Sequence, residues 1–418
     1  MASDLPASAR PASVVFYNDP RVRSVAYQVA LCAVVVFLVY GAASNAIENL
    51  ARARIASGFG FWVQTAGFDI SQTLIGYSSR TSTYGRAFWV GLLNTLLVAG
   101  IGIVLATILG FIIGISRLSN NWLLAKAAGC YVELVRNLPL LLQLLFWYNA
   151  VLKALPDIRD SLSIGGRVFL NNRGLFLPTP IFKHGFGGAE IALLIGIICA
   201  TAYRIWARKR QERTGRQAPV LWVTLALVIG LPLATFILSG APLSFEFPQA
   251  GRFNITGGTE VLPEFVALLF GLTIYTAAFI AEVVRAGILA VSRGQSEAAF
   301  SLGLRPGPTL RLIVVPQAMR VIIPPLTSQY LNLTKNSSLA VAIGYPDLVQ
   351  VFTGTVLNQT GQAVEVVAIT MLVYLVISLA TSLLMNIYNS RMRASAGLQV
   401  EPRDFDQANA ARAHRRLH

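Results

Sequence analysis

Apolar residues in this chain gather into long runs, and short polar segments separate one run from the next. A helix needs about 20 apolar residues to cross a bilayer. Eight runs approach or exceed that length, and they cover residues 25–42, 88–115, 131–155, 190–205, 220–238, 261–291, 321–344 and 366–388. The pattern predicts an all-α polytopic membrane protein with about eight transmembrane helices.

The composition fits this prediction, because 55% of the 418 residues are hydrophobic and only 13% are charged. The net charge of +15 is explained by basic cytoplasmic loops. It does not indicate a nucleic-acid partner, since no basic stretch is interleaved with aromatic residues. The 3 cysteines and 3 histidines have no metal-ligand spacing and form no Ser/His/Asp arrangement. We therefore expect no metal and no cofactor.

Basic residues also predict the orientation of the chain. Arginines lie in residues 1–24 and throughout the tail 389–418, so the positive-inside rule places both termini in the cytoplasm. The run at 25–42 could also be a cleavable signal peptide. The region before it is long and the run has the length of a span, which favours a retained helix.

The loop after the sixth run has a distinctive spacing. Residues 294–316 read GQSEAAFSLGLRPGPTLRLIVVP. Ala298 and Ala299 are small helix formers that allow a partner to approach closely, and Gly303 permits a sharp turn. We expect Glu297 in the first turn of a short helix, where it suits the helix dipole, and Pro306 and Pro308 as the residues that stop this helix.

This spacing resembles the EAA motif of bacterial ABC-importer permeases, with Val315 in place of the usual Leu. In that family the segment is a coupling helix, which docks in a cleft of a separate ATP-binding subunit. An ordinary amphipathic cytoplasmic loop is the alternative interpretation. The resemblance implies a coupling role for Glu297, Ala298, Ala299, Gly303, Ile313 and Pro316.

A second segment, YVELVRNLPLLLQLLFWY from Tyr131, resembles the polar amino-acid branch of this family. The chain departs from that branch at Asn137-Leu138, where Gly-Thr is usual. The resemblance implies a type I importer core of five helices, in residues 88–155 and 261–388, with the coupling loop 294–316. Residues 156–260 are then an insertion with two extra helices, whose second external segment is either a simple connector or a contact for a soluble partner.

The whole pattern is similar to the longer permease subunit of importers for general L-amino acids or for glutamate and aspartate. That similarity implies two ATP-binding subunits, a second and often different permease subunit, and a periplasmic substrate-binding protein. It also implies a bacterial inner membrane and transport by alternating access.

The run 321–344 is the most polar of the predicted spans, and Pro324-Pro325 are expected to interrupt it. Polar groups at membrane depth are costly unless they line water, pair or meet a ligand. Lys335 either lines the substrate path, where it meets the carboxylate of an amino acid, or bonds to carbonyls at a helix end. The candidate path residues are Asn332, Lys335, Asn336 and Ser337.

The chain is not expected to hydrolyse ATP. A Walker A motif needs Gly before its Lys, and the five lysines follow Ala, Leu, Phe, Arg and Thr. A secondary transporter driven by an ion gradient is the alternative, although clear inverted repeats and mid-depth ionisable residues are missing. A membrane-embedded enzyme would need a catalytic constellation, which the sequence does not offer.

Overall fold

The computed structural model describes residues 20–52, 57–183, 185–251 and 254–394. The predicted end segments 1–24 and 389–418 therefore lie largely outside the described residues. Within these, seven helices are long and apolar enough to cross a bilayer, or eight if one bent helix pair is counted as a span. The prediction of a polytopic, mostly helical protein is confirmed.

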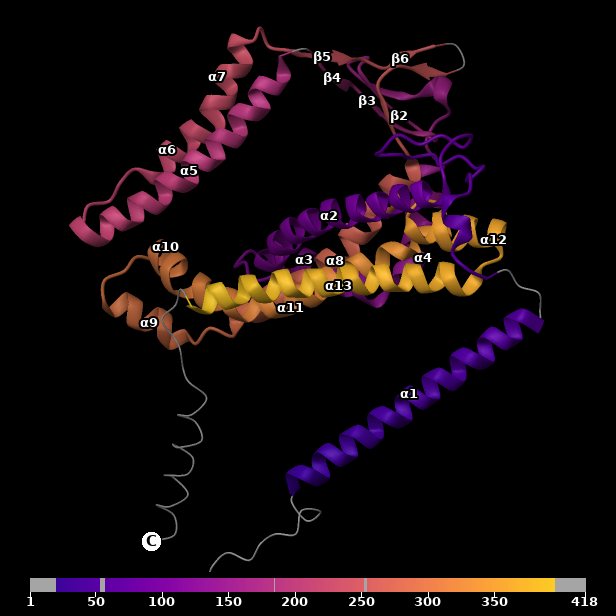
Figure 1. Cartoon of the computed structure of the whole chain (residues 1–418). Helices are drawn as coiled ribbons and strands as arrows, with labels where there is room; N and C mark the ends of the chain where they lie inside the picture. The colour runs from indigo at the N-terminus through magenta and orange to yellow at the C-terminus, as the bar shows by residue number, and fades with distance from the viewer. Residues whose placement is uncertain (1–19, 53–56, 184, 252–253, 395–418) are drawn as a thin grey trace, which may run out of the picture.

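The long helices are α1 (Pro20–Arg52), α2 (Tyr84–Ser116), α3 (Trp122–Asn137), α5 (Phe186–Thr214), α8 (Pro263–Leu289), α11 (Val315–Asn336) and α13 (Ala363–Ala394). The shorter ones are α4 (Leu140–Leu145), α6 (Val220–Leu225), α7 (Leu231–Leu238), α9 (Arg293–Ser301), α10 (Pro306–Thr309) and α12 (Leu357–Thr360). The π-helical segments are Phe146–Leu152, Ala226–Gly230, Leu310–Val314 and Val349–Val356, and short 3-10 helices occur at Gly60–Val63, Ile158–Asp160 and Ser337–Ile343. Figure 1 shows α2, α3, α8, α11 and α13 in one bundle, while α1 and the hairpin of α5 with α6 and α7 stand apart from it.

The bundle is built on a close contact between α2 and α8. A Cβ atom at Gly110 would lie 2.6 Å from Ile280 Cβ, and one at Gly114 would lie 2.8 Å from the carbonyl oxygen of Ala281. Ile280 and Ala281 are fully buried. The two glycines therefore let the backbones approach, as small residues do in membrane helix pairs. A separation of four residues between small residues favours close helix packing in general, and the structure identifies α8 as the partner.

The predicted continuous span 131–155 is wrong. The helix ends at Asn137 and resumes at Leu140, and its two parts are bent by 105°. Pro139 explains the break, because it lacks an N–H and excludes the residue before it from the helical conformation. Leu138 is accordingly extended, with φ −101° and ψ 135°.

The predicted interruption at Pro324-Pro325 is also wrong, because α11 runs through both prolines. Both rings are exposed on the outer side of the helix. Ile322, Ile323 and Leu326 are buried on the opposite side, at 4% exposure or less. This packing holds the helix on each side of the prolines, and membrane helices tolerate the lost backbone hydrogen bonds.

Residues 156–260, which were predicted to be an insertion with two extra helices, also contain β-strands. The first external segment forms β1 (Leu162–Ile164), β2 (Val168–Asn171), β3 (Gly174–Leu177) and β4 (Thr179–Phe182). The second forms β5 (Leu243–Glu246), β6 (Gln249–Ala250), β7 (Ile255–Thr256) and β8 (Thr259–Val261). Strands from the two segments pair as β1-β2-β3-β8 and as β4-β5. We call this set of strands the β unit.

We expect Gly110→Val to lower the thermal unfolding midpoint of the detergent-purified protein. The new side chain overlaps Ile280, and overpacking of this kind costs about 1–3 kcal/mol. Gly100→Val is the matched control, since a Cβ at this exposed position of α2 meets no atom within 4 Å. Equal midpoints for the two variants would contradict the role of the α2–α8 contact.

Candidate functional site

Helix α9 carries the motif predicted to contact an ATP-binding subunit. Ala299 is the buried residue of this helix, with 1% of its surface exposed. Glu297 and Ala298 are exposed. Phe300 and Leu302 are 50% and 82% exposed, although both are large and apolar. The helix therefore presents apolar side chains and one carboxylate away from the bundle.

A sharp turn at Gly303 ends this helix. Gly303 has a φ of +77°, in the left-handed region that favours glycine. Its N–H donates to the carbonyl of Phe300 (2.9 Å), and the N–H of Leu304 donates to the carbonyl of Ala299 (3.1 Å). These two bonds form a Schellman motif. The predicted turn at Gly303 is confirmed.

Two details of the prediction for this loop are wrong. Glu297 does not lie in the first turn, because α9 begins four residues earlier at Arg293. Pro306 and Pro308 do not stop α9, since Gly303 has already ended it; Pro306 instead begins α10. Proline is favoured at the first position of a helix, where its missing N–H has no partner to lose.

The remaining motif residues connect α9 to the bundle. Ile313 is half-buried in the π-helical segment before α11, and Pro316 is exposed in the first turn of α11. The Gln317 side-chain amide donates to Gln295 Oε1 across 3.2 Å and so joins α11 to α9. Residues of the motif thus lie both in α9 and in the segment that leads from the loop into α11.

One carboxylate joins three helices near this loop. Arg285 Nη2 lies 2.6 Å from Glu282 Oε1 within α8, where a separation of three residues on one helix favours such a pair. Arg117, at the end of α2, also pairs with Glu282, and Arg136 of α3 lies 3.8 Å from it. Sequence spacing can indicate the local partner but not the other two, because both are more than a hundred residues away.

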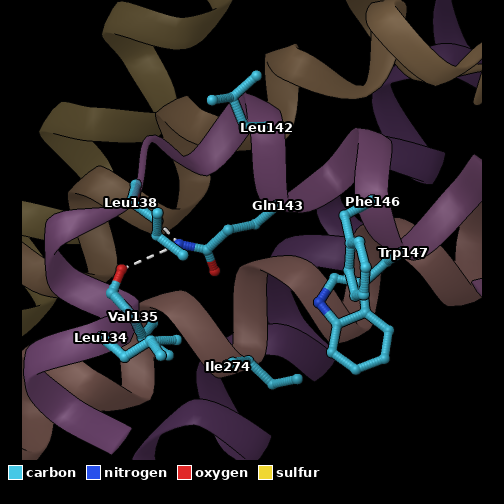
Figure 2. Close-up of a pocket in the computed structure, with 8 residues that line it drawn as sticks. All are labelled: Leu134, Val135, Leu138, Leu142, Gln143, Phe146, Trp147 and Ile274. Atoms are coloured by element: carbon cyan, nitrogen blue, oxygen red, sulfur yellow. Dashed lines mark hydrogen bonds between the residues drawn. The ribbon is translucent and has the colours of Figure 1, made fainter. Parts of the chain in front are cut away.

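The bend between α3 and α4 encloses an apolar pocket of about 380 Å³. Gln143 Nε2 donates to the carbonyl oxygens of Val135 (2.9 Å) and Leu138 (3.0 Å), which the break leaves without helical partners. Figure 2 shows this amide at one side of the pocket and the rings of Phe146 and Trp147 at another. The lining suits an apolar group and offers no charge to a ligand.

A second, more polar groove lies between α11, the segment 349–356 and α13. Its volume is about 500 Å³, and its polar lining comes from Lys335, Ser338, Thr353, Thr370, Tyr374 and Ser378. Lys335 is exposed, and no carboxylate of the described residues forms an ion pair with it. The hydroxyl oxygen of Thr353 is buried, and within the described part of the chain it has no hydrogen-bond partner.

The structure separates the four predicted path residues. Lys335 lines the groove, whereas Asn332 and Asn336 are not among its lining residues. Ser337 is fully buried and donates to the carbonyl oxygen of Thr334 (2.7 Å). Ser338, Thr353 and Tyr374 were missed, and for the last two the sequence held no signal, because they reach the groove from other segments. No metal-binding group of three His, Cys, Asp or Glu side chains occurs among the described residues.

Comparison with known proteins gives consistent matches along most of the chain. The family described as "Binding-protein-dependent transport system inner membrane component" matches residues 102–394. The chain is 55% identical to the general L-amino acid transport system permease protein AapQ of Rhizobium johnstonii over 374 residues, which is 90% of this chain and 93% of the relative.

Two further relatives match over similar lengths. The putative amino-acid ABC transporter permease protein YhdX of Escherichia coli is 50% identical over 90% of this chain and 95% of its own length. The glutamate/glutamine/aspartate/asparagine transport system permease protein BztB of Rhodobacter capsulatus is 42% identical over 94% of this chain and 99% of its own length.

We expect Glu282→Gln to destabilise the protein by about 1–3 kcal/mol, because it leaves Arg117 and Arg285 without their charged partner. Thermal unfolding of the detergent-purified chain measures this effect. Glu133→Gln makes the same change at an exposed glutamate of α3 with no ion pair in the described residues, and its midpoint should stay at the wild-type value. If both variants unfold at the wild-type temperature, Glu282 does not hold the three helices together.

Proposed function

Because the chain belongs to the family of binding-protein-dependent transport system inner membrane components, we propose that it carries L-amino acids through the membrane for an ATP-driven importer. Family membership already makes it a multi-pass permease subunit and sets aside the ion-driven secondary transporter. The names of the three relatives support the choice of amino acids as substrates.

The observation that carries the mechanism is the exposed face of α9. Phe300 of α9 and Leu302, directly after its last residue, are large apolar side chains in a segment that the Schellman turn and the buried Ala299 hold in a fixed orientation. Such a face is suited to a cleft in another protein. We assign the coupling role to Glu297, Ala298, Ala299, Gly303, Ile313 and Pro316, with an ATP-binding subunit as the partner.

Helix α8 provides the connection from α9 into the membrane. It ends at Leu289, and only three residues separate it from the start of α9 at Arg293. Glu282 lies two turns before that end and binds arginines of α2 and α3. A displacement of α9 would thus move the ends of three helices together, as rigid-body rocking requires.

The substrate path is proposed along the groove of Lys335. A cation beside hydroxyl groups suits the carboxylate of an amino acid, and the apolar lining from Val349, Val367 and Leu375 suits the rest of the molecule. Ser338 and Thr353 replace Asn332, Asn336 and Ser337 as the polar groups assigned to the path. The free hydroxyl of Thr353 supports this choice, because a buried polar group without a partner is costly unless a ligand or water meets it.

The complete importer is proposed to contain two ATP-binding subunits, a second permease subunit, and a periplasmic binding protein, in the inner membrane of a bacterium. The end of the bundle with α9 would face the cytoplasm, and both termini would lie on that side. The domain assignment follows the same proposal: residues 88–155 and 261–388 form the permease core, and residues 25–42 and 156–260 are additions to it.

Gly303→Val tests the coupling role. A β-branched residue is strained at a φ of +77°, so the turn that orients α9 should open while the spans remain intact. We expect amino-acid uptake to fall by at least about tenfold, with loss of the ATP-binding subunit from a mild-detergent pull-down. Gly307→Val is the control, since Gly307 lies in the same loop with open space around it and no left-handed φ. Normal uptake and pull-down for Gly303→Val would refute the assignment.

Lys335→Gln tests the substrate path. Loss of one charge-assisted hydrogen bond should lower the maximal uptake rate in proteoliposomes about tenfold or more, while Lys335→Arg retains most of it. Lys209→Gln at the exposed end of α5 serves as the control for charge removal. An unchanged rate for Lys335→Gln would leave Lys335 with a structural role.

A further inference from the structure

The four-stranded sheet of the β unit has two apolar faces, and one of them is only partly covered. Phe169 and Phe176 face each other on β2 and β3, and they are buried with Ile158 and Ile255. Side chains alternate along a strand, so the neighbouring positions point to the opposite face. The cross-strand pairs place the following residues there: Leu162, Ile164, Val168, Leu170, Leu175 and Val261.

None of these six residues is buried, and exposure is greatest at β1. Leu162 is 54% exposed and Ile164 is 77% exposed. In the sheet order β1 is the end strand, so within the described residues its outer edge has no partner strand. Edge strands are protected against association by charged side chains, among other devices, or by being very short; β1 is short, with the three residues Leu-Ser-Ile, and carries no charge. This open apolar edge is therefore suited to a partner protein.

Arginines lie at the border of this surface. Arg167 is in the turn between β1 and β2, and Arg173 is in the turn between β2 and β3. Both are exposed, and no carboxylate of the described residues forms an ion pair with either. An apolar centre with a basic rim is complementary to a surface with an apolar patch and acidic residues around it.

The position of the β unit in the molecule indicates which partner protein it contacts. Strand β8 ends at Val261 and α8 begins at Pro263, and the other end of α8 leads into α9. A helix of 27 residues is about 40 Å long, so the β unit and α9 lie at opposite ends of the bundle (Figure 1). On the proposed function, α9 meets the ATP-binding subunit and the opposite end receives the loaded binding protein.

We propose that the open face of the β unit, centred on Leu162 and Ile164 and bordered by Arg167 and Arg173, is the docking surface for the importer's soluble substrate-binding protein. The binding protein contributes an apolar patch with acidic residues around it. Its contact reaches α8 directly through β8, so docking and the coupling helix are joined by one continuous element.

The test uses the complete importer in proteoliposomes, with ATP hydrolysis measured against increasing concentrations of amino-acid-loaded binding protein. Ile164→Asp should raise the half-maximal concentration of binding protein at least about tenfold and leave hydrolysis without binding protein unchanged. Val63→Asp is the matched control, because Val63 is 76% exposed and lies outside the sheet. It should behave as wild type.

Arg167→Glu is a second variant, which keeps the six apolar residues of the open face and removes the contact of Arg167 with the ring of Phe247 (4.9 Å to the ring centroid). It should raise the same half-maximal concentration, and the effect should shrink at high salt. An unchanged concentration for both Ile164→Asp and Arg167→Glu would overturn the proposal. A change in hydrolysis without binding protein, at an unchanged half-maximal concentration, would also overturn it and indicate a lipid contact. If the rate of ATP hydrolysis by the wild-type importer does not change when binding protein is added, the result would instead refute the proposed function.

Discussion

The contact between α2 and α8 depends on positions where no side chain separates the two backbones. Lipid tails are as apolar as leucine, so membrane helices gain little from burial alone and depend on close packing. Gly110 and Gly114 supply that approach against Ile280 and Ala281. Helices α3 and α11 then pack on α8, and this places α8 at the centre of the bundle.

Because α8 lies at the centre of the bundle, the residues at its two ends connect it to different parts of the molecule. Near one end, close to the start of α9, Glu282 forms ion pairs with arginines of α2, α3 and α8 itself. At the other end β8 runs into α8 with a single residue between them. A rigid helix of this length transmits displacement between its ends, and the fold therefore connects the proposed docking surface to the proposed coupling helix without a flexible linker.

The break at Pro139 shows how a membrane protein accommodates irregular backbone. Freed carbonyl groups cannot bond to lipid, so they need partners within the protein. Gln143 supplies two hydrogen bonds from one amide and so permits a 105° bend beside an apolar pocket. The polar groove at Lys335 is different in kind, because within the described residues its cation has no ion pair and the buried hydroxyl of Thr353 has no hydrogen-bond partner.

Features that depend on residues near one another in the chain could be predicted from the amino-acid sequence. The apolar runs predicted the spans, and the motif spacing predicted the turn at Gly303. The separation of three residues on one helix is likewise typical of an ion pair such as that of Glu282 with Arg285. Local patterns failed at Pro139, where a 105° bend replaced an expected straight helix, and at Pro324-Pro325, where packing against α8 kept the helix intact. Contacts between distant residues lay beyond such patterns. Arg117 and Arg136 reach Glu282, Thr353 and Tyr374 reach the groove of Lys335, and β3 finds β8 across the intervening hairpin, because the packing of whole helices brings these residues together.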